Sequence, residues 1–575
     1  MTVHAASTPV RLPVWRARLV FAAFLALFVV LAARSVYLQV LHTDFLRGKG
    51  EARYSRVLEV PATRGRIVDR NGAALAVSTP VKSVWAIPGD VVLSAAQRAK
   101  LALLLGMDVR DLDRRLADQS RDFVYLKRQV SPEASERVAE LGIAGVYDRR
   151  EFRRYYPGGE VTAQVVGFTG VDENGQEGME LAFESLLAGQ PGGRRVIKDR
   201  LGRVVEDIEA LSPARDGGEL ALSIDGKIQS LAFSVLRSAV EQHRAKAGAL
   251  IALDTHTGEV LALANYPSYN PNNRARMTGD QVRNRVLTDV FEPGSTLKPF
   301  TIALALELER VTPTTRIPTA PGSMTIARYT IRDSHPAAAM SVSEVVQRSS
   351  NVGAAKIALS LPRERMWEFF RSVGFGTPPQ LDFPGEAGGR LRDHRSWRPV
   401  EQATMGYGHG ISVSLAQLAR AYLLFARDGD LVPLTLVRSA TPAEGMPVIS
   451  ARTAHAMRAM LEAAVQPGGT APRARVPGWR VAGKTGTAHK PEKGGYAANR
   501  YIASFVGFAP VSDPRLVIAV MIDEPSAGEY YGGSVAAPVF AQTMQGALRL
   551  LGVPYDAPLD PVPLPGEGEE LREST

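Results

Sequence analysis

"FEPGSTLKPF", residues 291–300, places a serine and a lysine three positions apart at the start of an apolar run. On a helix, positions i and i+3 lie on one face within a single turn, so Ser295 and Lys298 would share a face. Gly294 permits a sharp turn into the helix, and Pro299 is tolerated only near a helix start. The segment therefore predicts a helix that begins at a serine and carries a lysine beside it.

This serine–lysine pair has two interpretations. A serine hydroxyl is a weak nucleophile until a base takes its proton. A lysine can be that base when burial or nearby positive charge lowers its pKa, whereas an arginine stays protonated. The competing interpretation is a snorkelling lysine, and roughly one Ser-x-x-Lys is expected by chance in a chain of this length. Other segments of the sequence are needed to tell whether Ser295 and Lys298 are a nucleophile with its base or ordinary surface residues of a helix.

A second polar pair lies in "QRSSNVG", residues 347–353, where Ser349 and Asn351 are two positions apart. At a loop or helix start, the hydroxyl and the amide can point into one cleft. The hydroxyl would then relay a proton to a leaving group, and the amide would hold a substrate amide. Taken alone, the pair is better explained as a serine that caps a helix with an asparagine beside it.

The third segment, "AGKTGTA" (482–488), has the pattern of a β-strand. Gly486 would let a ligand approach the backbone closely. An extended edge strand can hydrogen-bond a peptide that lies alongside it. Lys484, Thr485 and Thr487 would then meet a substrate carboxylate. The competing interpretation of Lys-Thr-Gly is a turn.

The order of the three segments favours catalysis over the separate alternatives. Ser-x-x-Lys, a Ser-x-Asn element and Lys-Thr-Gly, in this order, form the signature of penicillin-binding proteins and class A β-lactamases. Here the first segment opens a helix and the last lies on a predicted strand. Three weak signals in the right order and context make a strong one.

At these residues the chain resembles the class B penicillin-binding proteins, and the resemblance covers residues 55–550. "RGRIVDRNG" (64–72) is similar to the opening of the family's non-catalytic pedestal. The segments that resemble its transpeptidase core are "GALIALDTHTGEVLALANYPSYNPN" (248–272), "YGHGISVSLAQLARAY" (407–422) and "ASFVGFAP" (503–510). Residues 155–184 and "GGSVAAPVF" (532–540) are most similar to the division-specific septal transpeptidases of the FtsI type.

The resemblance implies an α+β, multidomain fold. The expected parts are a cytoplasmic N-terminus (1–18), a single transmembrane helix (19–41), a mostly β pedestal of the dimerisation type (55–210), a transpeptidase domain (218–551) and a disordered tail (552–575). The transpeptidase domain is expected to be an antiparallel sheet with helices, similar to the serine β-lactamases.

The resemblance also implies a reaction, a serine-type D-Ala-D-Ala transpeptidase or carboxypeptidase acyl transfer that β-lactams block. Ser295 would be acylated by the penultimate D-alanine carbonyl of a stem peptide, Lys298 would be the base, and the N–H groups of Ser295 and Thr487 would form the oxyanion hole. No metal or organic cofactor is implied. The other implied positions are catalytic Ser349, Asn351 and Lys484 and substrate-binding Thr485, Gly486 and Thr487.

The implied biology is septal cell-wall synthesis at the cell inner membrane. The implied partners are peptidoglycan stem peptides, β-lactam antibiotics, a polytopic glycan polymerase of the FtsW kind and other division proteins. The alternative is an elongation-specific transpeptidase of the side wall. A β-lactamase is less favoured because we find no segment for its deacylating carboxylate, and a penicillin sensor would normally have further membrane spans.

Composition excludes several classes of function and of site. The 575 residues carry a formal net charge of +9, but the basic residues are scattered without aromatic interleaving, which argues against nucleic-acid binding. The absence of cysteine excludes disulfides, a thiol nucleophile and thiolate metal sites.

The N-terminal apolar segment predicts an uncleaved membrane anchor. Residues 19–33 contain no charged side chain but are too short to span a bilayer, whereas an extension through Arg34 to Leu41 is long enough. Arg11, Arg16 and Arg18 precede the segment and place the N-terminus in the cytoplasm. A cleaved signal peptide is the alternative, but no clean small-x-small cleavage site follows the apolar run.

Overall fold

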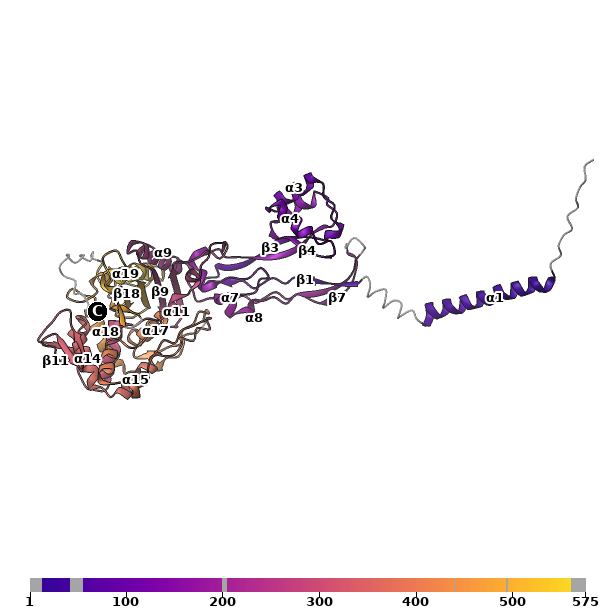
Figure 1. The fold of residues 1–575 in the computed structure, drawn as a ribbon. Coiled ribbons are helices and arrows are strands. Elements are labelled where there is room, and N and C mark those ends of the chain that lie inside the picture. Colours follow the sequence, from indigo (N-terminus) through magenta and orange to yellow (C-terminus); the bar gives the residue numbers. More distant parts are fainter. Residues whose placement is uncertain (1–12, 42–54, 199–203, 440, 493–494, 560–575) are drawn as a thin grey trace, which may run out of the picture. The chain divides into compact units, whose positions relative to one another are not determined.

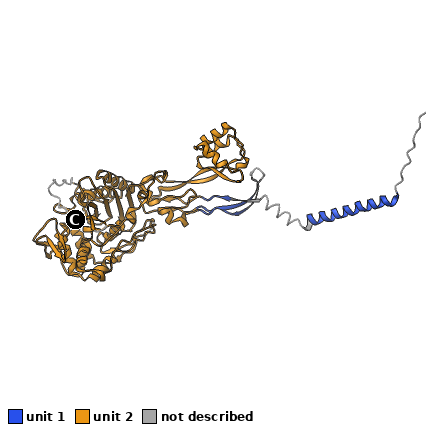
Figure 2. Ribbon diagram, viewed as in Figure 1, with its two compact units in different colours: residues 1–62, 189–216 blue, residues 63–188, 217–575 orange. Residues whose placement is uncertain are grey.

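The computed structural model describes residues 13–41, 55–198, 204–439, 441–492 and 495–559. The chain divides into two compact units, residues 1–62 with 189–216 and residues 63–188 with 217–575 (Figure 2). The last residues of the expected tail, 560–575, lie outside the described residues, as do the first twelve of the expected cytoplasmic N-terminus.

The first unit contains the N-terminal apolar helix. Helix α1 (Val14–Val36) continues into a π-helical turn, Tyr37–Leu41. Among the described helices, it is the one that is long and apolar enough to cross a membrane. The helix begins at Val14 rather than at residue 19. Pro13, directly before it, has an extended backbone and lacks the N–H that a helix interior needs. One N-terminal apolar helix fits a single-pass membrane anchor.

The rest of the first unit is a three-stranded antiparallel sheet in the order β1-β6-β7. Its strands are β1 (Ser55–Val60), β6 (Gly192–Lys198) and β7 (Val204–Ser212). The segment 211–220 begins inside β7, and Arg215 exchanges backbone hydrogen bonds with Gln190.

The second unit begins with a strand-rich region. Its sheet has the order β4-β3-β2-β8, with β5 also paired to β3. An Asn-Gly turn precedes strand β3, and its Gly72 has a φ of +85°. The strands are β2 (Ile67–Val68), β3 (Ala74–Ala86), β4 (Val124–Val130), β5 (Val146–Tyr155) and β8 (Leu220–Ala221). The helices are α3 (Ala95–Leu104), α4 (Val109–Leu116), α5 (Pro132–Ala139), α6 (Ala163–Val166), α7 (Gly178–Ala182) and α8 (Glu184–Leu187).

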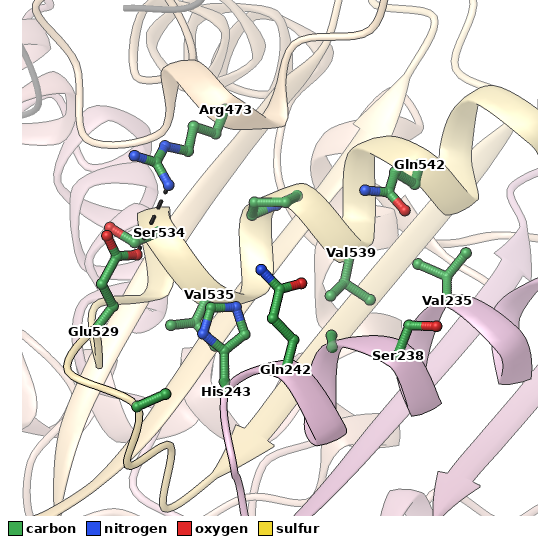
Figure 3. A pocket seen from close by; sticks show the side chains of 13 residues that line it. Val235, Ser238, Gln242, His243, Arg473, Glu529, Ser534, Val535, Val539 and Gln542 are labelled. Atoms are coloured by element: carbon green, nitrogen blue, oxygen red, sulfur yellow. Dashed lines mark ion pairs between the residues drawn. The ribbon is translucent and has the colours of Figure 1, made fainter. Parts of the chain in front are cut away.

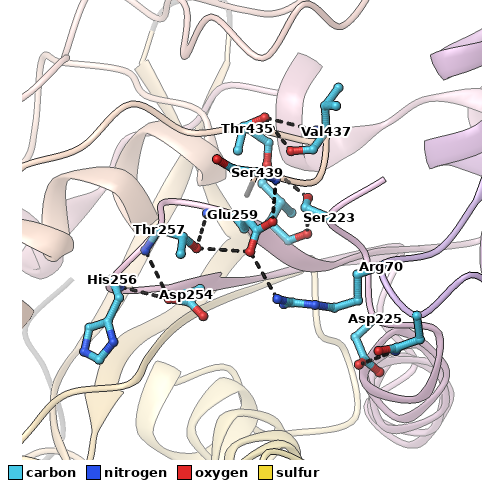
Figure 4. A network of polar contacts seen from close by, with 12 residues as sticks. Arg70, Ser223, Asp225, Asp254, His256, Thr257, Glu259, Thr435, Val437 and Ser439 are labelled. Atoms are coloured by element: carbon cyan, nitrogen blue, oxygen red, sulfur yellow. Dashed lines mark hydrogen bonds and ion pairs between the residues drawn. The ribbon is translucent and has the colours of Figure 1, made fainter. Parts of the chain in front are cut away.

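The segment 64–72 is tied by polar contacts to the start of the domain that follows (Figure 4). The guanidinium of Arg70 lies 3.2 Å from the carboxylate of Glu259, whose side chain is 2% exposed. That carboxylate also accepts hydrogen bonds from the backbone N–H of Ser439 and the hydroxyl of Thr257. One buried carboxylate therefore joins three segments that are far apart in the sequence.

The core of the second unit is a five-stranded antiparallel sheet in the order β10-β9-β19-β18-β17. It is assembled from both ends of the domain, as the sequence predicts. Its strands are β9 (Ala247–Asp254), β10 (Val260–Tyr266), β17 (Ala482–Glu492), β18 (Gly495–Ala509) and β19 (Leu516–Asp523).

Both faces of this sheet are covered by helices (Figure 1). Side chains alternate along a strand, so Leu250 and Ala252 of β9 pack with α9 (Gly226–Gln242) and α19 (Gly532–Leu550). Ile251 and Leu253 belong instead to the apolar cluster that contains α17 (Leu415–Ala426). Burial on both faces explains why these strands are almost continuously apolar.

The remaining elements surround the second face. The helices are α10 (Gly279–Val282), α11 (Arg285–Thr288), α12 (Lys298–Glu307), α13 (Val342–Gln347), α14 (Asn351–Ser360), α15 (Arg363–Ser372), α16 (Pro399–Met405) and α18 (Ala451–Ala463). The small strands are β11 (Arg316–Pro318), β12 (Ser323–Ile326), β13 (Tyr329–Arg332), β14 (Ala339–Ser341), β15 (Asp430–Leu431) and β16 (Met446–Pro447). The expected fold, an antiparallel sheet with helices, is confirmed.

The disorder expected from residue 552 does not hold for the first residues of that tail. The ring of Tyr555 packs against Trp479 with 4.4 Å between centroids, and the indole N–H donates to the carbonyl of Pro554 at 3.0 Å. Asp556 accepts a hydrogen bond of 2.7 Å from the backbone N–H of Arg480. Aromatic packing and these bonds order a segment whose proline content and acidity alone predict disorder.

Candidate active site

Ser295 lies in a tight turn that leads directly into a helix. The 3₁₀ turn Gly294–Leu297 is followed without a break by α12, which begins at Lys298. Gly294 has a φ of +54°, a conformation that residues with side chains rarely adopt, as expected from the sharp turn predicted there. Ser295 is 5% exposed and Lys298 is fully buried.

Lys298 reaches the second polar segment. Its Nζ donates to the carbonyl oxygen of Ser349 at 2.5 Å and to the hydroxyl oxygen of Ser349 at 3.0 Å. Ser349 has a φ of +63°, which is uncommon for a serine and strains the backbone. The fold therefore holds Ser349 against the amine by means of an unfavourable backbone conformation, a pattern found at functional sites.

The capping role belongs to the residue between Ser349 and Asn351. Ser350 accepts a hydrogen bond from the N–H of Gly353 at 2.8 Å and so caps α14. Its hydroxyl donates to a carboxylate oxygen of Asp333 at 2.7 Å. The interpretation of Ser349 as the cap is therefore wrong. Because Ser350 satisfies the helix end, Ser349 remains beside Lys298, and Asn351 is 7% exposed at the first turn of the helix.

The Lys-Thr-Gly segment is a strand, not a turn. It lies in β17, at the edge of the five-stranded sheet, with Lys484 opposite Val506. Lys484 is fully buried, and its Nζ donates to the hydroxyl of Thr485 at 3.1 Å. The hydroxyl of Thr487 accepts a 3.0 Å hydrogen bond from the N–H of Gly532, the first residue of α19.

Glycine 486 brings this strand onto the turn that carries Ser295. A Cβ atom at Gly486 would lie 2.9 Å from the carbonyl oxygen of Pro293 and 2.9 Å from a methyl carbon of Thr296. No side chain fits at that distance, so glycine is required for the close approach. The structure thus brings the first and third segments into direct contact and joins the first to the second through Lys298.

Several residues around Ser295 were not singled out by the sequence analysis. Thr470 places its hydroxyl 3.4 Å from Nζ of Lys484 and 2.9 Å from the hydroxyl of Thr485. The buried hydroxyl of Tyr422 donates to the carbonyl of Thr296 at 2.8 Å. No sequence signal predicts these contacts, because the partners are distant in the chain or lack a motif.

His409 and Glu292 add two titratable groups near the turn. Burial, followed by the positive charges of Lys298 and His489, lowers the pKa of His409 to about 4. Burial raises the pKa of the Glu292 carboxyl, although hydrogen bonds from Gly410 and Tyr496 oppose that shift. In the described ranges, no three His, Asp or Glu side chains cluster as a metal site.

A separate cavity lies between α9 and α19 (Figure 3). Arg473 and Glu529 form an ion pair of 3.7 Å at one end of it. Val535 and Val539 of α19 also line it. None of the site residues predicted from the sequence is among its lining residues, so this cavity is not the candidate site.

Two family descriptions match the chain. "Penicillin binding protein transpeptidase domain" matches residues 248–545, and "Penicillin-binding Protein dimerisation domain" matches residues 59–222. All three sequence segments of the candidate site lie inside the first match.

Relatives and solved structures agree with these matches. The protein named probable peptidoglycan D,D-transpeptidase PenA from Neisseria gonorrhoeae is 42% identical over 95% of this chain and 94% of its own. Peptidoglycan D,D-transpeptidase FtsI from Escherichia coli K12 is 40% identical over 94% of this chain and 93% of its own. The apo transpeptidase domain of Burkholderia pseudomallei penicillin-binding protein 3 is 49% identical, with a TM-score of 0.55, and covers 59% of this chain and 98% of its own.

Proposed function

The chain belongs to the class B penicillin-binding proteins, and on that premise we propose that it cross-links peptidoglycan stem peptides through an acyl-enzyme on Ser295. The observation that carries the proposal is a contact of Lys298, which lies three residues after Ser295: its amine donates to Ser349. The family matches at 59–222 and 248–545 support a division into a pedestal at 55–210 and a transpeptidase domain at 218–551.

The first half of the reaction forms the acyl-enzyme. The neutral amine of Lys298 takes the proton of the Ser295 hydroxyl, and Oγ attacks the carbonyl carbon of the penultimate D-alanine. The N–H groups of Ser295 and Thr487 stabilise the oxyanion. The proton passes through the hydroxyl of Ser349 to the nitrogen of the terminal D-alanine, the peptide bond breaks, and D-alanine leaves.

The second half of the reaction resolves the acyl-enzyme. The amine of a second stem peptide attacks the ester carbonyl, and its proton passes by way of Lys298 to the oxygen of Ser295, which leaves as the free hydroxyl. If water attacks instead, the same site acts as a carboxypeptidase. Lys484, Thr485 and Thr487 bind the terminal carboxylate of the donor, Gly486 admits its backbone to the strand, and Asn351 holds a donor amide. The scheme uses no metal or organic cofactor.

The acyl-enzyme is tested with a β-lactam, which traps it. Penicillin should acylate Ser295, and mass spectrometry of the digested adduct locates the modified residue. Ser295→Ala should form no adduct. An adduct that survives in Ser295→Ala, or one that maps to Ser349, would overturn the assignment.

We propose further that the enzyme serves septal synthesis at the division site in the inner membrane, with its catalytic domain outside the cytoplasm. The relatives named FtsI and the similarity of residues 155–184 and 532–540 support the septal role over the side wall. Fluorescent penicillin in dividing cells separates the two, because a septal enzyme labels mid-cell and a side-wall enzyme labels the whole perimeter.

A polytopic glycan polymerase of the FtsW kind is the proposed membrane partner, with Arg34 near the contact. Arg34 lies in the last turn of α1, with its guanidinium 5.3 Å from the ring centroid of Tyr37. A charge at that depth is costly unless it snorkels, pairs or marks a contact. Arg34→Leu in the full-length protein should insert normally and lose co-purification with the polymerase. Unchanged co-purification would leave Arg34 as a snorkelling residue.

A further inference from the structure

The carboxylate of Glu292 lies three residues before Ser295 and has no part in the reaction proposed above. Its Oε1 accepts a hydrogen bond of 2.9 Å from the backbone N–H of Gly410. The hydroxyl of Tyr496 donates to Oε2 at 3.0 Å and to Oε1 at 3.2 Å. One side chain therefore meets two segments that are more than 80 residues apart in the sequence.

The first of these segments, the loop 406–410, is already fitted to the turn of Ser295. The N–H of Gly294 donates to the carbonyl of Gly408 at 3.2 Å. Gly408 has a φ of +91°, and a Cβ atom there would lie 2.1 Å from the carbonyl oxygen of Gly294. The loop can approach this closely because Gly408 has no side chain. Glu292 holds the same loop through the N–H of Gly410.

The second segment is the start of β18, where Tyr496 pairs with Pro491 of β17 in the β17–β18 hairpin. β17 is the strand of Lys484 and Thr487, so a residue that restrains this hairpin also restrains the edge that would bind the donor peptide. The ring of His409 lies 5.9 Å from that of Tyr496 and 5.2 Å from that of Tyr407. These rings fill the space between loop and hairpin beside the carboxylate.

We propose that Glu292 is a positioning residue that holds the loop 406–410 and the β17–β18 hairpin against the Ser295 turn. The inference rests on the proposed function, because its consequence is the alignment of Ser295 with a donor on β17. Misplacement by about 1 Å of groups that act on one substrate is enough to slow a reaction strongly. A carboxyl that only filled space could be replaced by an apolar side chain, whereas this one accepts three hydrogen bonds from Gly410 and Tyr496.

The test compares Glu292→Ala, Glu292→Gln and Tyr496→Phe in the full-length protein, with Tyr555→Phe as the control for losing an exposed tyrosine hydroxyl away from Ser295. The readouts are the rate constant of Ser295 acylation by fluorescent penicillin, separated from the penicillin binding constant, and the melting temperature. Glu292→Ala should slow acylation about tenfold or more. Glu292→Gln should recover most of the rate, since its one amide oxygen can still accept from the N–H of Gly410 and the hydroxyl of Tyr496. Tyr496→Phe should lie between, and Tyr555→Phe should match the wild type.

Coupling distinguishes positioning from a general effect on folding. If Glu292 acts through Tyr496, the double variant Glu292→Ala/Tyr496→Phe should be no slower than Glu292→Ala alone. Additive effects, or a Glu292→Ala protein that acylates at the wild-type rate, would overturn the inference. A loss of rate that merely follows a loss of folded protein would do the same. Failure of the proposed function is distinct, because the wild type itself would then form no adduct at Ser295.

Discussion

Buried charge is handled in two different ways in the two halves of the second unit. In the strand-rich region, Arg64 and Arg154 donate to opposite oxygens of Glu180 at 2.6 and 2.7 Å, and all three side chains are at most 2% exposed. Around Ser295, the buried amines of Lys298 and Lys484 donate to hydroxyl and carbonyl oxygens. In the scaffold, two arginines share one carboxylate, whereas these contacts of the two site lysines are with hydroxyl and carbonyl oxygens.

The largest effect should come from exchanging each buried lysine of the candidate site for arginine. Lys298 must lose its proton to act as the base, so Lys298→Arg should lower β-lactam acylation about a thousandfold or more, since a guanidinium stays charged. Lys484→Arg keeps the positive charge for the substrate carboxylate and should lose only about ten- to a hundredfold. Acylation rates of the two variants, measured on folded protein, decide the matter. An active Lys298→Arg enzyme contradicts the role of Lys298 as the base.

The second prediction exchanges a charge in the scaffold. Glu180→Gln removes the carboxylate that pairs with the buried Arg154 and leaves Arg64 with Glu184 alone, so the free energy of unfolding should fall by about 3–5 kcal/mol. The matched control is Glu219→Gln, which removes the partner of Arg66 in an ion pair whose side chains are 47% and 65% exposed, and which should cost at most about 1 kcal/mol.

Urea unfolding of both variants measures the difference, and penicillin acylation of the folded protein completes the comparison. Glu180→Gln should acylate at the wild-type rate wherever it is folded. If Glu180→Gln and Glu219→Gln had equal free energies of unfolding, the buried ion pairs of Glu180 would contribute no more to stability than the exposed pair of Glu219. A specific loss of acylation in Glu180→Gln would show instead that the scaffold charges serve the reaction.

Local patterns in the sequence predict the elements better than the contacts between them. The apolar runs of β9 and β19 and the helical period of α9 predict those elements, because burial on two faces or on one stripe leaves its mark on consecutive residues. Arg64 and Glu180 are 116 residues apart, and no periodicity connects them. Such pairs form only when the chain packs into its tertiary structure, and no short stretch of the sequence predicts them.

The candidate site shows the same limit. Motif spacing predicts a helix that begins at Ser295, whereas Ser295 lies in a 3₁₀ turn and the α-helix begins at Lys298. The sequence also favours Ser349 as the helix cap, whereas Ser350 is the cap. Ser349 has a positive φ, and the sequence does not show which of the two adjacent serines adopts it. Glu292 lies inside the quoted motif, but its partners Gly410 and Tyr496 come from other segments.

The smallest expected effect concerns a third basic group beside the buried lysines. The pKa of His409 is lowered to about 4 by burial and then by the charges of Lys298 and His489, against an unfolded value of about 6.5. Because the folded state binds this proton less tightly than the unfolded state, the contribution of His409 to stability is present above pH 6.5. It is lost progressively as the pH falls towards 4, by about 1–3 kcal/mol. Burial thus disfavours a positive charge on His409, whereas the two scaffold arginines pair with Glu180 and Glu184. His409→Gln should show a shallower loss of stability between pH 6.5 and 4, with a constant difference from the wild type above pH 7. Urea unfolding at a series of pH values measures both curves, and parallel curves across the whole range would mean that no proton is excluded at His409.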